Sequence, residues 1–203
     1  MTGVCRDCGS SPADSHLGGD GPLCDRCFDD RIAAATGLPR LPDAPAPVVL
    51  TGADGRRHVM RYRIWRAPTG VVVELREDDV PDGEGFEFGV LGGHEAEVGP
   101  LADAVREQAA AQVRRRYLEP GPDGVGWRLA GDEIAGRLVY NPEGGPYRVV
   151  VDGRSLSWQE LGEALESFEG WRFRLVIEDA MADMRPNADV LVFPSADGSG
   201  TTA

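Results

Sequence analysis

Four cysteines are the residues of this chain whose type and spacing point most directly to chemistry. Cys5 and Cys8 form one C-x2-C pair, and Cys24 and Cys27 form a second pair after fifteen intervening residues. They are the only cysteines in the sequence. Two such pairs can present four thiolates to one tetrahedral ion, and this spacing is typical of structural zinc sites. The sequence therefore predicts one structural Zn2+ held by these four residues.

Other uses of the cysteines are open at this stage. Disulfides need an oxidising compartment, but residues 1–10 contain no apolar run typical of a signal peptide. A thioredoxin-like redox pair needs one C-x-x-C at a strand-to-helix junction, not two pairs in a glycine-rich segment. An iron or iron–sulfur site would also use four thiolates. His16 could replace one cysteine, but with four sulfurs present we expect it to be a solvated loop residue.

Short turns followed by a helix are expected to position the cysteines. Gly9 directly follows Cys8, where a knuckle folds sharply and glycine tolerates positive φ. Residues 29–36 have helical composition and end at Gly37 and Pro39, a common pair of helix terminators. A knuckle, a loop or hairpin, and a second knuckle leading into a helix resembles treble-clef and zinc-ribbon modules. The resemblance covers residues 5–36 and implies a metal-bound module of the kind that binds DNA, RNA or protein, or braces a fold.

Length, composition and charge limit what the rest of the chain can be. The 203 residues leave room for one or two domains besides the small module, and 41% of them are hydrophobic. No run approaches the roughly 18 apolar residues of a membrane span, so we expect a soluble cytoplasmic protein with no membrane partner. The net charge is −13 and all basic residues are arginine. Because phosphate backbones attract clustered positive charge, this balance disfavours generic nucleic-acid binding.

Proline- and glycine-rich segments suggest five regions along the chain. We predict a zinc module at residues 1–40, a proline-rich linker at 41–47, and a lobe of β-meander plus helix at 48–119. A second, ββαβ lobe is expected at 125–180, and residues 194–203 have the composition of a disordered tail. The predicted fold class is α+β, with antiparallel sheet lobes that are each packed with a helix.

In the first lobe apolar and polar residues alternate, as in strands, and apolar residues then recur at the spacing of a helix. Four strands are expected at residues 48–51, 57–66, 71–77 and 86–91. The turn at residues 67–70 places Tyr62 opposite Leu75 and Ile64 opposite Val73 on an apolar side, with Arg63 opposite Glu74 on the other side. Pro100 suits the first turn of the following helix. Its apolar stripe is Leu101, Val105, Ala109, Val113 and Tyr117.

The second lobe is expected to contain two strands, a helix and a final strand. The strands are predicted at residues 133–140 and 147–151, and the last one at 171–177. Ser157 and Glu160 form a capping box at the start of the helix. The helix is expected to bury Trp158, Leu161, Leu165 and Phe168. The segments 157–162 and 169–173 are similar to an uncharacterised bacterial family that joins a cysteine-knuckle N-terminus to such an α+β body; this resemblance implies the architecture and no known activity.

Candidate sites beyond the cysteines are fewer and less specific. A basic stretch contains Arg56, Arg57, His58, Arg61, Arg63 and Arg66, with Tyr62 and Trp65 interleaved. Arginine beside aromatic residues on a sheet can stack bases and clamp phosphates. The alternative, which we favour, is a solvated sheet face neutralised in part by Glu74 and Glu77. Arg114, Arg115 and Arg116 are expected in the last turn of their helix, where cations complement the dipole.

No residue is assigned a catalytic or cofactor-binding role. His94 with Glu95 and Glu97 on a glycine-containing loop could form a hydrolytic or second metal site, but we expect a polar loop. No H-E-x-x-H, G-x-S-x-G or P-loop motif is present. A glutamate row beside the last helix (Glu160, Glu163, Glu166, Glu169) is expected to be a solvated face.

These observations favour one function and leave two others open. We expect a zinc-stabilised cytoplasmic adaptor or regulatory protein that acts through protein–protein contacts. The first alternative is a nucleic-acid-binding regulator that uses the zinc module and the arginine strand at residues 56–66. The second is an enzyme with a site near His94, for which a pocket must enclose that side chain.

Overall fold

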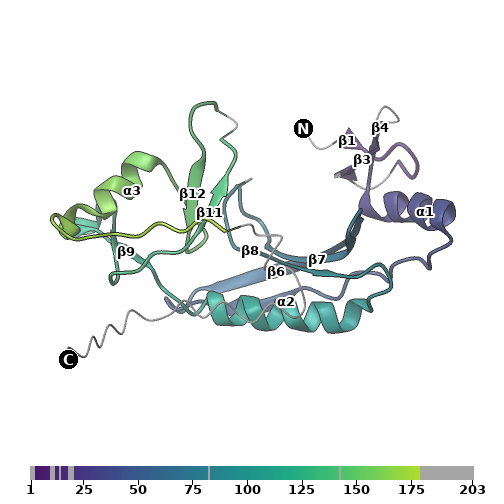
Figure 1. Cartoon of the computed structure of the whole chain (residues 1–203), viewed down its shortest axis with the longest axis horizontal. Coiled ribbons are helices and arrows are strands. Elements are labelled where there is room, and N and C mark those ends of the chain that lie inside the picture. Colours follow the sequence, from purple (N-terminus) through teal and green to yellow (C-terminus); the bar gives the residue numbers. More distant parts are fainter. Residues whose placement is uncertain are drawn as a thin grey trace, which may run out of the picture.

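The chain folds into three regions, seen side by side in Figure 1. The computed structural model describes residues 3–9, 12–13, 15–17, 21–81, 83–141 and 143–178. These residues form antiparallel sheets and three α-helices, which confirms the predicted α+β class. We refer to residues 3–37 as the cysteine module, 48–113 as the sheet lobe and 117–178 as the C-terminal lobe. In Figure 1 the sheet lobe lies between the other two regions.

The cysteine module consists of two small hairpin-like pairs and one helix. Its elements are β1 (Gly3–Val4) paired with β2 (Pro12–Ala13), β3 (Ser15–Leu17) paired with β4 (Gly21–Leu23), and α1 (Asp25–Thr36). The helix begins four residues earlier than predicted because Cys24 is its N-cap, so the second cysteine pair lies in its first turn. It ends as predicted at Gly37, whose φ of 75° places it in the left-handed region.

The sheet lobe is a four-stranded antiparallel meander. Its strands follow one another in the order β5 (Val48–Thr51), β6 (Arg57–Ala67), β7 (Gly70–Glu77) and β8 (Glu87–Gly92). The predicted register is confirmed: Tyr62 pairs with Leu75, Ile64 with Val73 and Arg63 with Glu74. The apolar side chains therefore alternate onto one face of the sheet, as the period of two requires.

Helix α2 (Val98–Gln112) covers that apolar face (Figure 1). Leu101, Val105 and Ala109 pack with the buried β-strand residues in one core, as the stripe predicts. The predicted continuation of the stripe is wrong because the helix ends at Gln112. Tyr117 packs instead in the core of the next lobe, and Arg114 to Arg116 lie beyond the helix end. Beyond the helix, the backbone N–H groups of Tyr117 and Leu118 donate to Asp152 of the C-terminal lobe.

The C-terminal lobe is built from two small sheets and a short helix. One hairpin pairs β9 (Leu118–Pro120) with β10 (Trp127–Leu129), and a 3₁₀ turn lies between them at Pro122–Gly124. A three-stranded sheet contains β11 (Arg137–Val139), β12 (Arg148–Val151) and β13 (Arg154–Leu156). The capping box of Ser157 and Glu160 is present at the start of α3 (Trp158–Ala164), and a 3₁₀ turn at Glu166–Phe168 follows.

Two predictions for this lobe are wrong. Residues 171–177 are not a strand: within the described chain they pair with no neighbouring strand, and all of them are exposed. Alternation favours a strand only when a sheet edge offers a partner for the backbone. Trp158 and Leu165 are also 43% and 40% exposed, because α3 has only seven residues and Ala164 takes the buried position.

The sheet lobe and the C-terminal lobe keep separate apolar cores but are joined by polar contacts. The backbone N–H of Gly85 donates to the carbonyl of Gly153 at 2.8 Å. Arg137 of β11 lies 3.0 Å from Glu87 of β8. The predicted tail at residues 194–203 lies outside the described residues.

Among the helices of the described residues, none combines the length and the apolar character that crossing a membrane requires.

Candidate metal centre

The structure brings the four predicted cysteines together. Their sulfur atoms all lie within 4.8 Å of one another, and the Sγ atoms of Cys8 and Cys24 are 3.8 Å apart. A tetrahedral site with metal–sulfur bonds of about 2.3 Å has sulfur–sulfur edges of about 3.8 Å. All four cysteines are described, and none forms a disulfide. The cluster therefore fits one metal ion bound by Cys5, Cys8, Cys24 and Cys27.

Backbone hydrogen bonds fold each cysteine pair into a tight turn. In the first pair the N–H of Gly9 donates to the carbonyl of Cys5 at 2.9 Å, and Gly9 has a φ of 68°. In the second pair the N–H of Phe28 donates to the carbonyl of Cys24 at 2.9 Å, which starts α1. A side chain at Gly9 would be strained, so this glycine is needed for the turn as predicted.

The electrostatics of the cluster favour a bound cation. The pKa of Cys5 is lowered because backbone N–H groups, first that of Cys24 and then that of Cys8, hydrogen bond to its sulfur. The pKa of Cys27 is strongly raised, first by burial and then by the neighbouring sulfurs of Cys24, Cys5 and Cys8. Four closely packed thiols resist losing all their protons unless positive charge is placed among them. A divalent metal supplies that charge, since metal ligation requires thiolates.

A bidentate ion pair links the first cysteine turn to the helix that contains the second. Arg31 of α1 donates from Nε and Nη2 to the two carboxylate oxygens of Asp7, at 2.9 and 2.7 Å. Asp7 lies between Cys5 and Cys8, and the hydrogen bonds from Arg31 are the first cause of its lowered pKa. This planar pairing fixes direction as well as distance. It therefore holds the two halves of the metal site in one orientation.

A second set of ion pairs joins the module to the sheet lobe. Asp25 and Asp29 lie one helical turn apart on α1, and both face β6. Arg63 Nη2 donates to Asp25 at 2.8 Å, and Arg66 Nε donates to Asp29 at 2.7 Å. Asp29 and Arg66 are buried, whereas the Arg63 pair is partly exposed.

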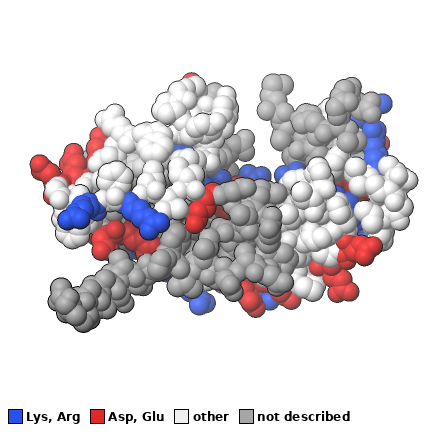
Figure 2. All heavy atoms as spheres, viewed as in Figure 1, with Lys and Arg blue, Asp and Glu red and all other residues white. Residues whose placement is uncertain are grey.

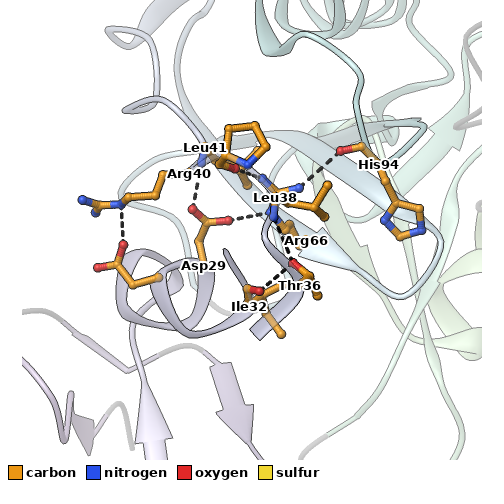
Figure 3. Close-up of polar contacts among 10 residues, drawn as sticks. Asp29, Ile32, Thr36, Leu38, Arg40, Leu41, Arg66 and His94 are labelled. Carbon is orange, nitrogen blue, oxygen red and sulfur yellow. Dashed lines mark hydrogen bonds and ion pairs between the residues drawn. The ribbon is translucent and has the colours of Figure 1, made fainter. Parts of the chain in front are cut away.

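Figure 3 shows that the guanidinium of Arg66 forms hydrogen bonds in three directions. Besides Asp29, its guanidinium donates to the carbonyl of Pro39, in the segment after α1, and to that of His94, in the loop after β8. Asp29 also accepts a hydrogen bond from the backbone N–H of Leu41 at 2.8 Å. A buried charge pair is tolerable only when its remaining donors and acceptors are satisfied in this way. The junction therefore couples the helix of the metal site to the body of the protein.

The arginine strand at residues 56–66 is largely engaged within the molecule. Besides Arg63 and Arg66, Arg61 lies 2.5 Å from Asp78, and His58 lies 2.7 Å from Glu77. Glu74 contributes a longer contact of 3.7 Å to Arg63. The expected neutralisation of this strand is thus present, although most of it comes from aspartates. Figure 2 shows acidic and basic side chains interspersed, with no continuous basic surface on the face in view.

His94, Glu95 and Glu97 do not form an enclosed site. All three residues are exposed, and His94 uses its backbone carbonyl to accept from Arg66. Figure 3 shows the imidazole of His94 pointing away from the polar cluster. The arrangement required for the alternative of an enzyme centred on these residues is absent.

The junction is the part of the site that sequence reasoning missed. Its signal is present in the sequence: two aspartates four residues apart flank Cys27, and two arginines three residues apart lie on one strand. The spacing alone does not reveal that the helix and the strand face each other. The backbone of His16, which was predicted to lie in a loop, lies in strand β3 instead.

Comparisons with known proteins assign names to regions of the chain but no activity. Residues 42–114 match the model described as Domain of unknown function (DUF7686), and residues 117–182 match Domain of unknown function (DUF7713). The chain is also similar to 1,4-alpha-glucan branching enzyme GlgB 1 of Rhizobium etli, with 30% identity over 130 residues. That match covers 56% of this chain and 16% of the enzyme.

No solved structure matches the chain significantly. The two matched regions correspond to the sheet lobe and to the C-terminal lobe, and both lie after the cysteine module. They fit the expected resemblance to an uncharacterised domain family. The chain thus contains two regions that match domains of unknown function, preceded by a four-cysteine cluster able to bind a metal ion.

Proposed function

We propose that this chain is a zinc-stabilised adaptor or regulatory protein that acts through protein–protein contacts. The observation that carries the proposal is the exposed apolar segment after α3. Trp171, Phe173, Leu175 and Ile177 are 65%, 91%, 68% and 70% exposed. Large apolar side chains gathered on a surface mark interaction sites in folded proteins. The segment is also free of strand pairing within the described residues.

The sequence of this segment suits one mode of contact. Its large apolar residues alternate with Arg172, Arg174 and Val176, so an extended conformation places Trp171, Phe173, Leu175 and Ile177 on one side. An extended peptide can add as a strand to the sheet edge of a partner, where backbone hydrogen bonds give affinity and alternate side chains give specificity. We therefore propose that residues 171–177 become a strand when the partner supplies the edge.

Zinc is the metal we propose for the cysteine cluster. Four thiolates in a tetrahedral set suit Zn2+ in a closed structural site, which leaves no position for substrate. The order of a knuckle, a hairpin and a second knuckle in the first turn of a helix is that of treble-clef modules. Arg31, Arg63 and Arg66 attach the helix of this module to the first knuckle and to the sheet lobe. A metal in this position would brace the N-terminal region against the body.

Nucleic acid is the less favoured partner. The net charge of −13 repels phosphate backbones, and Arg61, Arg63 and Arg66 already form ion pairs within the molecule. Nucleic-acid binding through this strand predicts that affinity falls steeply with salt and weakens in the Arg61→Ala, Arg63→Ala double variant. Tight binding of duplex DNA at physiological salt would replace our proposal with this alternative.

The experiment compares proteins captured from native lysate by three forms of the full chain. These are the wild type, the Phe173→Ser, Leu175→Ser double variant, and a control with Val125→Ser and Tyr140→Ser. The control residues are 76% and 74% exposed, so it removes similar apolar surface elsewhere. We expect the segment variant alone to lose a partner, which is then purified and titrated to measure its Kd. Equal capture by all three forms contradicts the proposal.

A further inference from the structure

A cleft of about 220 Å³ lies where the sheet lobe and the C-terminal lobe meet. Its walls come from the turn between β5 and β6, the segment after α2, and the turn between β12 and β13. Four arginines line it: Arg56, Arg115, Arg116 and Arg154. The cleft shares no residue with the cysteine cluster or with segment 171–177. The cleft thus gathers four positively charged side chains in a chain whose net charge is −13.

None of the four arginines forms an ion pair with a carboxylate in the described part of the chain, unlike Arg61, Arg63 and Arg66 of β6. Arg116 Nε donates to the carbonyl of Leu118 at 3.0 Å. Arg115 Nη1 donates to the hydroxyl of Tyr117 at 3.3 Å.

Arg154 stacks over Trp127, with its guanidinium carbon 4.4 Å from the ring centroid. These contacts orient the guanidinium groups without neutralising them.

Two aspartates also line the cleft, but backbone groups already engage them. Asp152 Oδ2 accepts from the N–H groups of Tyr117 and Leu118, at 2.9 and 2.8 Å. Asp54 Oδ1 accepts from the N–H of Arg56 at 2.9 Å. That hydrogen bond is the first cause of the lowered pKa of Asp54, to which the charges of His58 and Arg154 add. With four arginines against two aspartates, the cleft keeps an excess of positive charge.

We propose that this cleft binds the phosphoryl group of a small phosphate-bearing molecule. Guanidinium forks match the geometry of phosphate oxygens, and each can donate two parallel charge-assisted hydrogen bonds. A cleft lined by one sign of charge also concentrates the electrostatic field on its ligand. The volume suits one or two phosphoryl groups rather than a polymer. The four arginines repel one another, and a bound dianion relieves that repulsion.

The test is a calorimetric titration of the full chain with inorganic pyrophosphate. The cleft variant is Arg56→Ala with Arg115→Ala. The matched control is Arg57→Ala with Arg114→Ala, because each control residue is the sequence neighbour of a cleft arginine, removes the same charge and does not line the cleft. We expect saturable binding that weakens at least about tenfold in the cleft variant, as loss of charge-assisted hydrogen bonds predicts. The control is expected to stay within about twofold of the wild type, because Arg57 and Arg114 are exposed and do not line the cleft, so they cannot hydrogen bond to a ligand bound in it, and solvent and salt screen their charge.

Parallel titrations with inorganic phosphate and ADP distinguish the source of the phosphoryl group. Tighter binding of ADP assigns a phosphate ester, whereas tighter binding of phosphate or pyrophosphate assigns a free anion. The single Arg56→Ala variant keeps the test valid if the double variant does not fold, because the exposed side chain of Arg56 lies on a surface turn. Absence of saturable binding of all three ligands, or equal weakening in the cleft and control variants, overturns the proposal.

Discussion

Among the described residues, three buried residues form the apolar cluster of the cysteine module, whereas eleven form that of the sheet lobe. Two of the three in the module are the cysteines Cys5 and Cys24 themselves. The sheet lobe instead places residues such as Met60, Val73 and Leu75 against α2, all fully buried. A region with so little apolar surface cannot offset the entropy of ordering its backbone. The comparison indicates that one chain can stabilise neighbouring regions by different means: apolar burial in the sheet lobe and, as we propose, metal ligation in the cysteine module.

Removal of the metal is expected to have the largest effect and to separate the two regions. Structural zinc contributes on the order of 10–16 kcal/mol to small zinc modules. With a strong chelator, or in a Cys24→Ser variant, we expect hydrogen-exchange protection to be lost over α1 and β4. Protection of β6 and β7 should persist, because their core contains no metal ligand. Equal loss of protection in both regions would show that they form one cooperative unit and break the comparison.

Asp29→Ala is expected to have the next largest effect, since it leaves Arg66 buried without its partner. Breaking a buried ion pair from one side costs about 3–5 kcal/mol. The free energy of unfolding, measured with denaturant, should fall by that amount. Asp30→Ala is the matched control, because Asp30 is the next residue on α1 and pairs with Arg40 at the surface. Exposed ion pairs contribute only about 0–1 kcal/mol. Equal effects of the two substitutions would show that the buried Asp29–Arg66 pair stabilises the protein no more than an exposed ion pair does.

Leu75→Ala tests the apolar side of the comparison. Leu75 is fully buried in the sheet core, and such truncations cost about 2–5 kcal/mol. Metal content per chain is expected to stay at the wild-type value while the thermal midpoint of the sheet lobe falls. Leu138→Ala, at a half-exposed position of β11, should change stability little. Loss of metal from the Leu75 variant under native conditions would contradict separate stabilisation.

Ser157→Ala is expected to have the smallest effect and extends the comparison to the C-terminal lobe. The N–H and hydroxyl of Ser157 donate to Glu160, and these bonds are the first causes of the lowered pKa of that carboxyl. A lowered pKa means that the stabilisation is present at pH above the ordinary glutamate value and is lost as pH falls through the folded-state value. Loss of the cap should cost about 1 kcal/mol near neutral pH and less in acid.

The direct measurement for this substitution is an NMR titration of Glu160. Its pKa should rise part of the way towards the ordinary glutamate value in Ser157→Ala, because the hydroxyl is lost while the backbone N–H of residue 157 is kept. The pKa should stay low in Ser167→Ala, which removes an exposed hydroxyl elsewhere. An unchanged pKa in Ser157→Ala would show that the hydroxyl of Ser157 does not hold the carboxylate.

Local patterns allowed much of the fold to be predicted. The spacing of Cys5, Cys8, Cys24 and Cys27 predicted the cluster, because the knuckle geometry is local to each pair. The turn at Pro68 and Thr69 predicted the register of β6 and β7, because a short turn fixes which residues face each other. The capping box likewise depends on only four consecutive residues. In each case the interacting groups are near in sequence.

Features that depend on distant partners were not predictable in this way. Residues 171–177 alternate like a strand but have no described sheet edge beside them. Trp158 and Leu165 lie at helical spacing, but the short α3 leaves them at the surface. The pairing of Asp29 with Arg66 requires that α1 dock on β6, a contact between segments 37 residues apart. The arginine-lined cleft likewise exists only where two lobes meet.

The central claim, one zinc ion bound by four thiolates, is tested most directly on reduced full-length protein purified without added metal. Elemental analysis would be paired with titration of thiol reactivity before and after a chelator. The account predicts one zinc per chain and four thiols that react only after the metal is removed. Substoichiometric metal together with four freely reactive thiols would contradict it.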